Sequence, residues 1–182
     1  GVKVGLEMFT SEGPSSVERL KKDGWTVFLD LKLHDIPNTV QAAAISAGNI
    51  GADYLTIHIA SGKETLLAAK ESKPENLKLL GVSTALTSKA YSPEISQRVY
   101  EEFLLAKESK IDGVICPPSE LFKTKELFDL IVTPGIRLKN DDSHDQKNIT
   151  TPEKAIRDGA SYLVMGRSIR QNINYVVEKL KL

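Results

Sequence analysis

The stretch LDLKLHDIPNTV, from Leu29 to Val40, places charged residues directly inside an otherwise apolar strand pattern. Because side chains alternate between the two faces of a strand, Asp30 and Lys32 point to one face while the neighbouring leucines point to the other. Opposite charges on one strand face are costly to bury unless they pair or take part in chemistry. An exposed edge strand with a surface ion pair is the plainer interpretation. The rest of the chain favours the functional one.

Outside this stretch, short β-like runs alternate with helical patterns along the chain. Proline at a first helical position, as at Pro37, and capping hydroxyls before proline at Ser92 and Thr151 indicate helix starts. Gly51 and Gly159 are predicted helix ends. The predicted strands are Val2–Gly5, Thr26–Leu33, Tyr54–His58, Leu79–Thr84, Gly113–Cys116, Leu130–Val132 and Tyr162–Met165.

Strand–helix alternation indicates an α/β fold in which parallel strands are joined by right-handed crossovers. Units that follow one another without a linker predict one domain over residues 1–182, either doubly wound or a (β/α)8 TIM barrel one unit short. The barrel is favoured because polar residues recur at C-terminal strand ends, where barrel active sites assemble. A doubly wound nucleotide fold would need a glycine fingerprint after its first strand. Since Val2 already belongs to a strand, we expect that material N-terminal to Gly1 is missing.

Composition narrows the class of protein. The chain is 41% hydrophobic and 26% charged, which is typical of a soluble globular domain. Lys plus Arg (24) balance Asp plus Glu (24), and this balance argues against a nucleic-acid-binding surface while leaving room for a phosphate site. A single cysteine, Cys116, suits a reducing compartment. With no membrane-spanning run and no signal-peptide pattern, we expect a cytoplasmic protein without nucleic-acid or membrane partners.

Four charged residues form the candidate catalytic set. Lys3 lies on the first predicted strand, and Asp30 and Lys32 lie about 6.6 Å apart at Cα on the second. Asp35 lies in the turn that follows, where it could face the same pocket or a neighbouring subunit. A row of alternating charges would keep Lys32 protonated and fixed, as a proton donor requires. A Schiff-base lysine is the alternative, but it needs a depressed pKa, which flanking carboxylates oppose. No metal spacing is convincing, although Asp30 and Asp35 could hold a hard cation.

Two later segments are candidates for binding a phosphate group. Gly166 and Arg167 follow the last predicted strand, where glycine lets backbone N–H groups approach an anion and arginine adds a forked donor. From Pro134 onward the chain stays polar for longer than an ordinary loop, which predicts a lid with Gln146 as a donor. Ser88 could add a hydroxyl after the fourth strand. A plain surface loop and a plain turn serine are the alternatives.

Taken together, these segments resemble the orotidine 5′-monophosphate decarboxylase family. The resemblance implies a (β/α)8-barrel homodimer that converts orotidine monophosphate to uridine monophosphate, in pyrimidine biosynthesis, without a metal or organic cofactor. The family begins with a further βα unit that has no counterpart in this sequence, so we expect an open barrel. The segments that carry the resemblance are Asp30–Val40, Lys3–Thr10, Leu86–Ser88, Thr133–Arg137, Asp145–Gln146 and Gly166–Arg167.

The resemblance also implies a role for each matching residue. Lys32 would protonate C6 of the pyrimidine, with Asp30 against the departing carboxylate and Lys3 near the ribose. Two other interpretations remain open: a Mg²⁺-dependent decarboxylase or aldolase of the same barrel superfamily, and an inactive binder of phosphate ligands. The remaining implied contacts are Asp35, Ile36 and Thr39 across the dimer, Ser88 at the pyrimidine, Gln146, Gly166 and Arg167 at the phosphate, and Pro134 in the closing loop.

Overall fold

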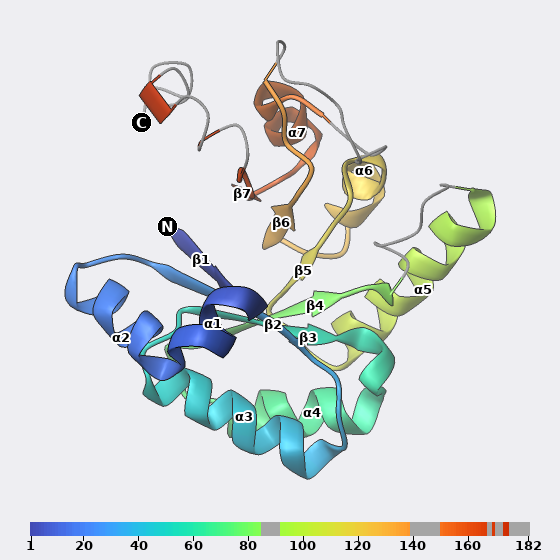
Figure 1. Cartoon of the computed structure of the whole chain (residues 1–182). Helices are drawn as coiled ribbons and strands as arrows, with labels where there is room; N and C mark the ends of the chain where they lie inside the picture. The colour runs from blue at the N-terminus through green and yellow to red at the C-terminus, as the bar shows by residue number, and fades with distance from the viewer. Residues whose placement is uncertain (85–91, 139–149, 167–168, 170–172, 175–182) are drawn as a thin grey trace.

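The computed structural model describes residues 1–84, 92–138, 150–166, 169 and 173–174. In this part of the chain seven parallel strands form one sheet in the order of the sequence (Figure 1). The strands are β1 (Val2–Gly5), β2 (Val27–Leu33), β3 (Tyr54–His58), β4 (Lys78–Val82), β5 (Gly113–Ile115), β6 (Ile131–Thr133) and β7 (Tyr162–Leu163).

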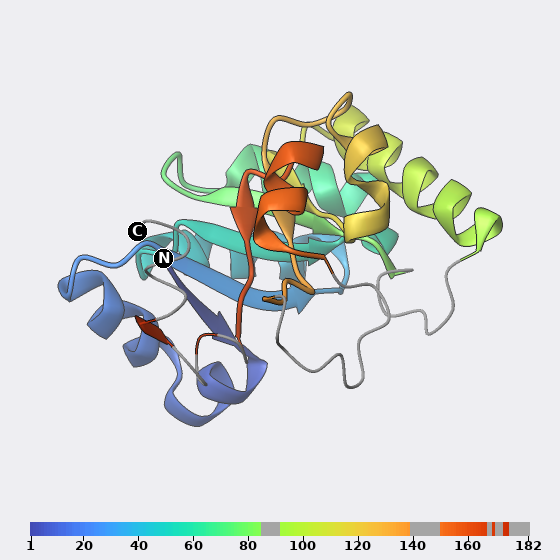
Figure 2. The same ribbon diagram turned by 90° about the horizontal axis from the view of Figure 1, so that it is seen from above.

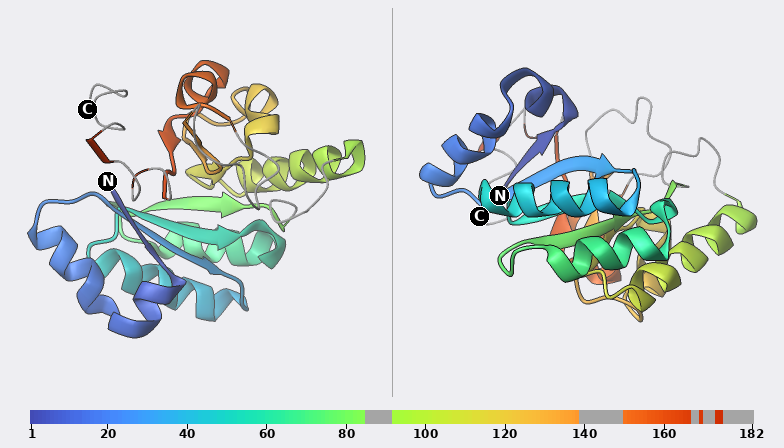
Figure 3. Two further views of the ribbon diagram at one scale, coloured as in Figure 1. Left: turned by 45° about the horizontal axis from the view of Figure 1, so that its top comes forward. Right: turned by 90° about the horizontal axis from the view of Figure 1, so that it is seen from below.

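Helices cover the outer face of this sheet, which curls so that β5, β6 and β7 turn away from the plane of the first strands (Figures 1 and 2). Figure 3 shows α3 and α4 side by side below β1–β4, and α5, α6 and α7 beside the later strands. The α-helices are α1 (Leu6–Glu12), α2 (Pro14–Lys22), α3 (Pro37–Asn49), α4 (Lys63–Ser72), α5 (Pro93–Glu108), α6 (Leu121–Thr124) and α7 (Pro152–Asp158), with 3-10 turns η1 (Ile59–Ser61) and η3 (Pro118–Glu120).

The observed architecture is a parallel, curled (β/α) half-barrel with β1 and β7 at its two edges, in keeping with the predicted barrel that is one unit short. Each of the seven predicted strands is present: β1 and β3 have the predicted ends, and the other five differ at one or both ends by one or two residues. Three predicted helix starts are confirmed: Pro37 is the first residue of α3, while the side chains of Ser92 and Thr151 accept backbone hydrogen bonds at the starts of α5 and α7. These local signals work because the first backbone N–H groups of a helix have no partner within the helix. A capping hydroxyl accepts one of these N–H groups, and a proline at the first position has none to leave unpaired.

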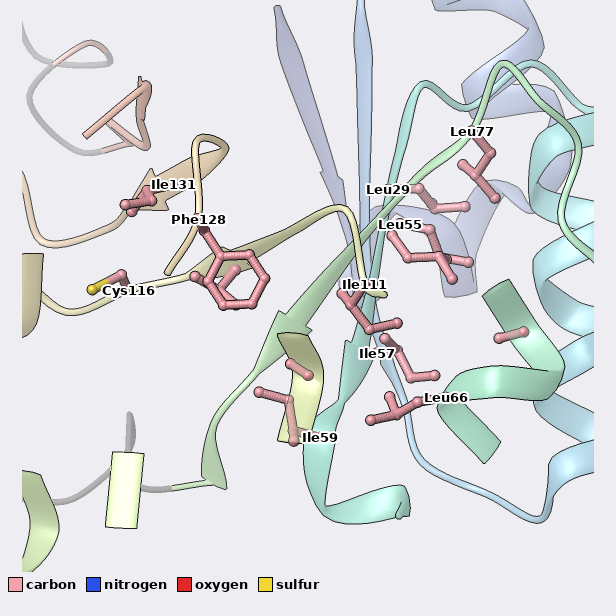
Figure 4. Close-up of a cluster of buried hydrophobic side chains, with 14 of the residues drawn as sticks. Leu29, Leu55, Ile57, Ile59, Leu66, Leu77, Ile111, Cys116, Phe128 and Ile131 are labelled. Atoms are coloured by element: carbon pink, nitrogen blue, oxygen red, sulfur yellow. The ribbon is translucent and has the colours of Figure 1, made fainter. Parts of the chain in front are cut away.

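The sheet separates two apolar layers. On its outer face, Leu29, Leu55 and Ile57 point from the strands toward the helices, where Leu66 of α4 meets them (Figure 4). On the inner, concave face of the sheet lies a smaller cluster of buried apolar side chains. This inner cluster comprises Leu80, Val82, Ile115 and Val132, with Phe28, Tyr54, Leu130 and Val164 packed against it. Burial on both faces explains why the strands are apolar runs and why charges on β2 stand out.

A repeated hydrogen bond ties the N-terminal ends of the strands together. The side chain of the residue just before β3, β5 or β7 accepts a hydrogen bond from a backbone N–H of the strand that comes before it in the sequence. The strands β2, β4 and β6 are therefore each bonded to the start of the next strand. The bonds are Val27 N to Asp53 Oδ2 (2.7 Å), Leu79 N to Asp112 Oδ2 (2.8 Å) and Ile131 N to Ser161 Oγ (3.0 Å). These bonds leave the opposite, C-terminal ends of the strands for chemistry.

Candidate active site

Three of the four predicted charged residues meet at β1 and β2. Lys32 Nζ lies 2.7 Å from Asp30 Oδ1, and Lys3 Nζ lies 3.2 Å from Asp30 Oδ2. The carboxylate is largely buried, with 12% of its side chain exposed, while the two lysines are about 40% exposed at 39% and 40%. Gly5 makes room for this contact, since a Cβ there would stand 3.0 Å from Lys3 Nζ. A buried anion therefore holds two cations whose outer sides face solvent.

This arrangement fixes the charge of Asp30. Burial alone would raise the pKa of its carboxyl, but the hydrogen bond and charge of Lys32, with the charge of Lys3, outweigh burial and hold the pKa below its ordinary value. Asp30 therefore remains ionised at neutral pH. A fixed negative charge beside a half-exposed ammonium can both repel a nearby carboxylate and keep a proton donor in place.

The backbone at Lys32 is strained. Its φ is 51°, in the left-handed region that costs a side chain about 1–2 kcal/mol. The Lys32 N–H donates to Thr56 Oγ1 at 2.8 Å, and the Thr56 hydroxyl donates to Asp30 Oδ1 at 3.0 Å. The bond to the charged Asp30 carboxylate contributes roughly 1.5–3 kcal/mol and the neutral bond from Lys32 N roughly 0.5–1.5 kcal/mol, which together are enough to offset the strain. Sequence reasoning missed Thr56 because one hydroxyl within an apolar strand carries no signal of its own.

Two histidines lie beside this charged group. The rings of His34 and His58 are 5.3 Å apart between centroids and tilted by 49°. Burial, then the charge of His34, lowers the pKa of His58, and the charge of Lys32 adds to the effect. Among the described residues none hydrogen-bonds the buried Nδ1 of His58. His58 therefore resists protonation.

Asp35, the fourth predicted charged residue, lies apart from the other three. It is exposed, and its Oδ1 accepts the backbone N–H of Ile36 at 2.7 Å. Ile36 is 65% exposed and Thr39 is also exposed. Asp35 and Ile36 line a groove together with the η1–α4 segment Ala60–Thr65. Within this chain the charged array therefore comprises Lys3, Asp30 and Lys32, and Asp35 lies outside it.

The predicted phosphate end is described only in part. Pro134 follows β6 and is half-buried, and Gly166 is exposed with open space around the position of a Cβ. Two backbone hydrogen bonds, Arg137 N to Thr150 O and Thr150 N to Gly135 O, join the two ends of the polar segment that follows Pro134. Ser88, Gln146 and Arg167 lie outside the described residues.

The described residues contain no group of three or more histidine, cysteine, aspartate or glutamate side chains placed to hold a metal ion. None of the helices in the described ranges combines the length and apolar character needed to cross a membrane.

The sequence is similar to a known protein family and to individual enzymes of that family. The family model described as Orotidine 5'-phosphate decarboxylase / HUMPS family matches residues 1–180. The orotidine 5'-phosphate decarboxylase of Fusobacterium nucleatum is 43% identical over 188 residues, which cover 95% of this chain and 79% of that protein. The enzyme of the same name from Moorella thermoacetica is 41% identical, with coverage of 92% of this chain and 74% of that protein.

Solved structures agree with the sequence relatives. The crystal structure of orotidine 5'-phosphate decarboxylase from Lactobacillus acidophilus superposes with a TM-score of 0.83 at 34% identity, covering 99% of this chain and 84% of that chain. An uncharacterized conserved protein from Geobacillus kaustophilus superposes with a TM-score of 0.79 at 33% identity, covering 99% of this chain and 85% of that chain. With a family model matched over nearly its whole length, this chain belongs to the Orotidine 5'-phosphate decarboxylase / HUMPS family.

Proposed function

We propose that the chain decarboxylates orotidine 5′-phosphate to uridine 5′-phosphate, with the charged group of Lys3, Asp30 and Lys32 as its catalytic centre. Relatives that bear the name of this carboxy-lyase are about 40% identical over nearly all of the chain. The observation that carries the proposal is a buried carboxylate held between two ammonium groups at 2.7 and 3.2 Å. This arrangement suits a reaction in which one carboxylate leaves and one proton arrives.

The reaction needs two electrostatic contributions at one carbon. As the C6–carboxylate bond breaks, carbon dioxide leaves and the bonding electron pair stays on C6. Asp30 would lie against the departing carboxylate and destabilise it, while the ammonium of Lys32 would stabilise the developing negative charge. Lys32 then transfers a proton from Nζ to C6 and regains one from solvent. Protons and electrons balance without a further reactant.

Binding energy from the distant phosphate would support this step. Gly166, Arg167 and Gln146 are proposed to hold the phosphate, Ser88 to contact the pyrimidine, and Pro134 to belong to the loop that closes on the nucleotide. A phosphate group far from the reacting carbon is well suited to hold the substrate carboxylate against Asp30, because its binding energy can offset the repulsion.

A second copy of the chain is proposed to complete the site. Asp35, Ile36 and Thr39 lie exposed around the start of α3, outside the array of their own subunit. An exposed isoleucine beside a groove with flanking polar residues is suited to a protein–protein contact. In the proposed homodimer these three residues contact the substrate site of the partner subunit.

Loss of the Lys32 ammonium should abolish turnover without abolishing nucleotide binding. We expect Lys32→Ala to lower kcat by about a thousandfold or more, since proton donation and charge stabilisation are lost together. Turnover is followed by the change in absorbance of orotidine 5′-phosphate, and binding by calorimetry with uridine 5′-phosphate. Substantial turnover by Lys32→Ala would remove Lys32 from the role of proton donor.

Two controls make this test specific. Lys21→Ala removes another lysine–aspartate pair, Lys21 with Asp53, from the opposite end of the sheet, and should leave kcat unchanged. Wild-type enzyme is also assayed after treatment with a strong chelator, and we expect full activity. Activity that is lost on chelation and restored by Mg²⁺ would favour the metal-dependent sugar-phosphate chemistry instead.

A further inference from the structure

The pairing of β2 with β3 is interrupted at the catalytic residues. Leu29 pairs with Leu55 and Leu33 pairs with Ile57, so three residues of β2 lie opposite the single residue Thr56 of β3. A bulge of this kind bends the strand and leaves backbone groups without their ladder partners. The three bulged residues are Asp30, Leu31 and Lys32.

Thr56 supplies the missing partner from its side chain. The Thr56 residue is fully buried, and its Oγ1 accepts the Lys32 N–H at 2.8 Å in place of a strand carbonyl. A hydroxyl has one proton, which here is donated to Asp30 Oδ1 at 3.0 Å. One side chain therefore bonds the backbone of the lysine and the carboxylate of the aspartate at the same time.

The left-handed backbone of Lys32 depends on this contact. A lysine at a φ of 51° persists only where the surroundings hold it there. The bond from Lys32 N fixes the backbone, and the bond to Asp30 fixes the acceptor of Lys32 Nζ. Strain at a catalytic position, offset by a buried neighbour, is the pattern expected of pre-organisation.

We propose that Thr56 is a positioning residue for the reaction, whose hydroxyl holds the bulged backbone of Lys32 and the carboxylate of Asp30 in register. This inference rests on the proposed decarboxylation and extends it to a residue that does not itself touch the reacting carbon. The methyl group of Thr56 only fills space, so a serine at this position would retain the function and a valine would lose it.

The test compares Thr56→Val with Thr56→Ser in the full chain. We expect Thr56→Val to lower kcat roughly 10- to 100-fold, because small displacements of catalytic groups have effects of this size. KM should change by less than about threefold, and Thr56→Ser should restore most of kcat. Thr124→Val is the matched control, since Thr124 is also buried and its hydroxyl bonds Glu120 O at 2.8 Å on α6, away from the array.

A second readout separates this inference from the proposed reaction. In Thr56→Val the pKa of Asp30, followed by carbon NMR of its carboxyl, should rise because a donor is lost, while in Thr56→Ser and Thr124→Val it should not move. Unchanged Asp30 titration and unchanged kcat in a folded Thr56→Val would overturn the role of Thr56. Absence of turnover in the wild type, with the Asp30 titration still moved by Thr56→Val, would instead refute the decarboxylation and leave the positioning intact.

Discussion

Lys32 combines a strained backbone with a charge that the carboxylate of Asp30 stabilises. Its left-handed φ costs about 1–2 kcal/mol, and the hydrogen bond to Thr56 with the ion pair to Asp30 offsets that cost. Strain is tolerated here because the ammonium must stand over a buried carboxylate. A residue chosen for stability alone would be glycine or would leave the strand regular.

His58 should make the fold sensitive to mild acid. Because the pKa of His58 is lowered in the folded state, the unfolded chain binds the proton more readily once the pH falls below the ordinary histidine value of about 6.5. The free energy of unfolding should therefore be unaffected by this group above that pH and should decrease as the pH falls further. The imidazole is only half-buried and partly screened, so we expect a few tenths of a kcal/mol.

Urea unfolding at pH 7.5 and pH 5.5 measures this dependence, with pH values chosen on the two sides of the ordinary histidine pKa. His58→Gln should reduce the difference between the two conditions, because the variant has no proton to take up at this position. An equal difference in wild type and His58→Gln would show that other groups cause the acid sensitivity.

At the scale of elements, four helices end in the same way near the N-terminal ends of the strands. After each of α2, α3, α5 and α7, one residue with a left-handed backbone donates its N–H to a carbonyl in the last turn of the helix. The residue that follows it donates its N–H to the carbonyl one position earlier in the helix. Three of these left-handed residues are Gly24, Gly51 and Gly159, but after α5 the residue is Lys110, with a φ of 56°. Glycine adopts this conformation without strain, whereas lysine does not.

Lys110→Gly should therefore stabilise the protein. Relief of the left-handed strain, less the extra freedom that glycine gives to the unfolded chain, predicts a gain of roughly 0.5–1 kcal/mol. Urea unfolding measures the gain, and kcat should be unchanged because Lys110 precedes β5 at its N-terminal end, whereas the proposed catalytic residues Asp30 and Lys32 lie toward the C-terminal end of β2. Lys107→Gly, inside the last turn of α5, should instead destabilise by about 1 kcal/mol. A loss of stability in both variants would show that Lys110 is not strained.

At the scale of the whole molecule, a cavity of about 300 Å³ lies between the two edge strands of the curled sheet, β1 and β7. It is lined by residues of both strands and by the inner aromatic residues Phe28 and Tyr54. Tyr54 and Tyr162 face each other across it with hydroxyls 3.3 Å apart. Burial, followed by this hydrogen bond, raises the pKa of Tyr54 to about 12, so the phenol stays neutral. Lys3 belongs to the charged array and also lines this cavity.

The proposed dimer is also a property of the whole molecule. Ile36→Asp should shift the protein toward monomer and lower kcat/KM, because a charge is placed on an exposed apolar side chain that we propose to be buried by the partner. Sedimentation measures the oligomeric state over a range of concentrations. Phe122→Asp on α6 is the matched control, since Phe122 is 69% exposed and Ile36 is 65% exposed. Dimer formation that is equal in both variants would contradict the assigned surface.

Much of the fold and part of the site follow from local sequence signals. Capping hydroxyls, proline at helix starts and apolar strand runs act within a few residues, so they predicted the order of elements and the pairing of Lys32 with Asp30. The bond between Thr56 and the bulge joins residues that are far apart in the chain. Such a contact depends on the register of two strands, which no local pattern specifies.

The amino-acid sequence alone determined the alternation of strands and helices, the charged strand and the family resemblance, because each of these is written in short periodic or contiguous patterns. Only the tertiary structure decided that Asp35 stands apart from the other three charges, that a bulge turns Lys32 into a left-handed conformation, and that Thr56 holds both. The physical reason is that sheet curl and strand register set the distances between side chains on neighbouring strands, and these distances arise from packing over the whole barrel.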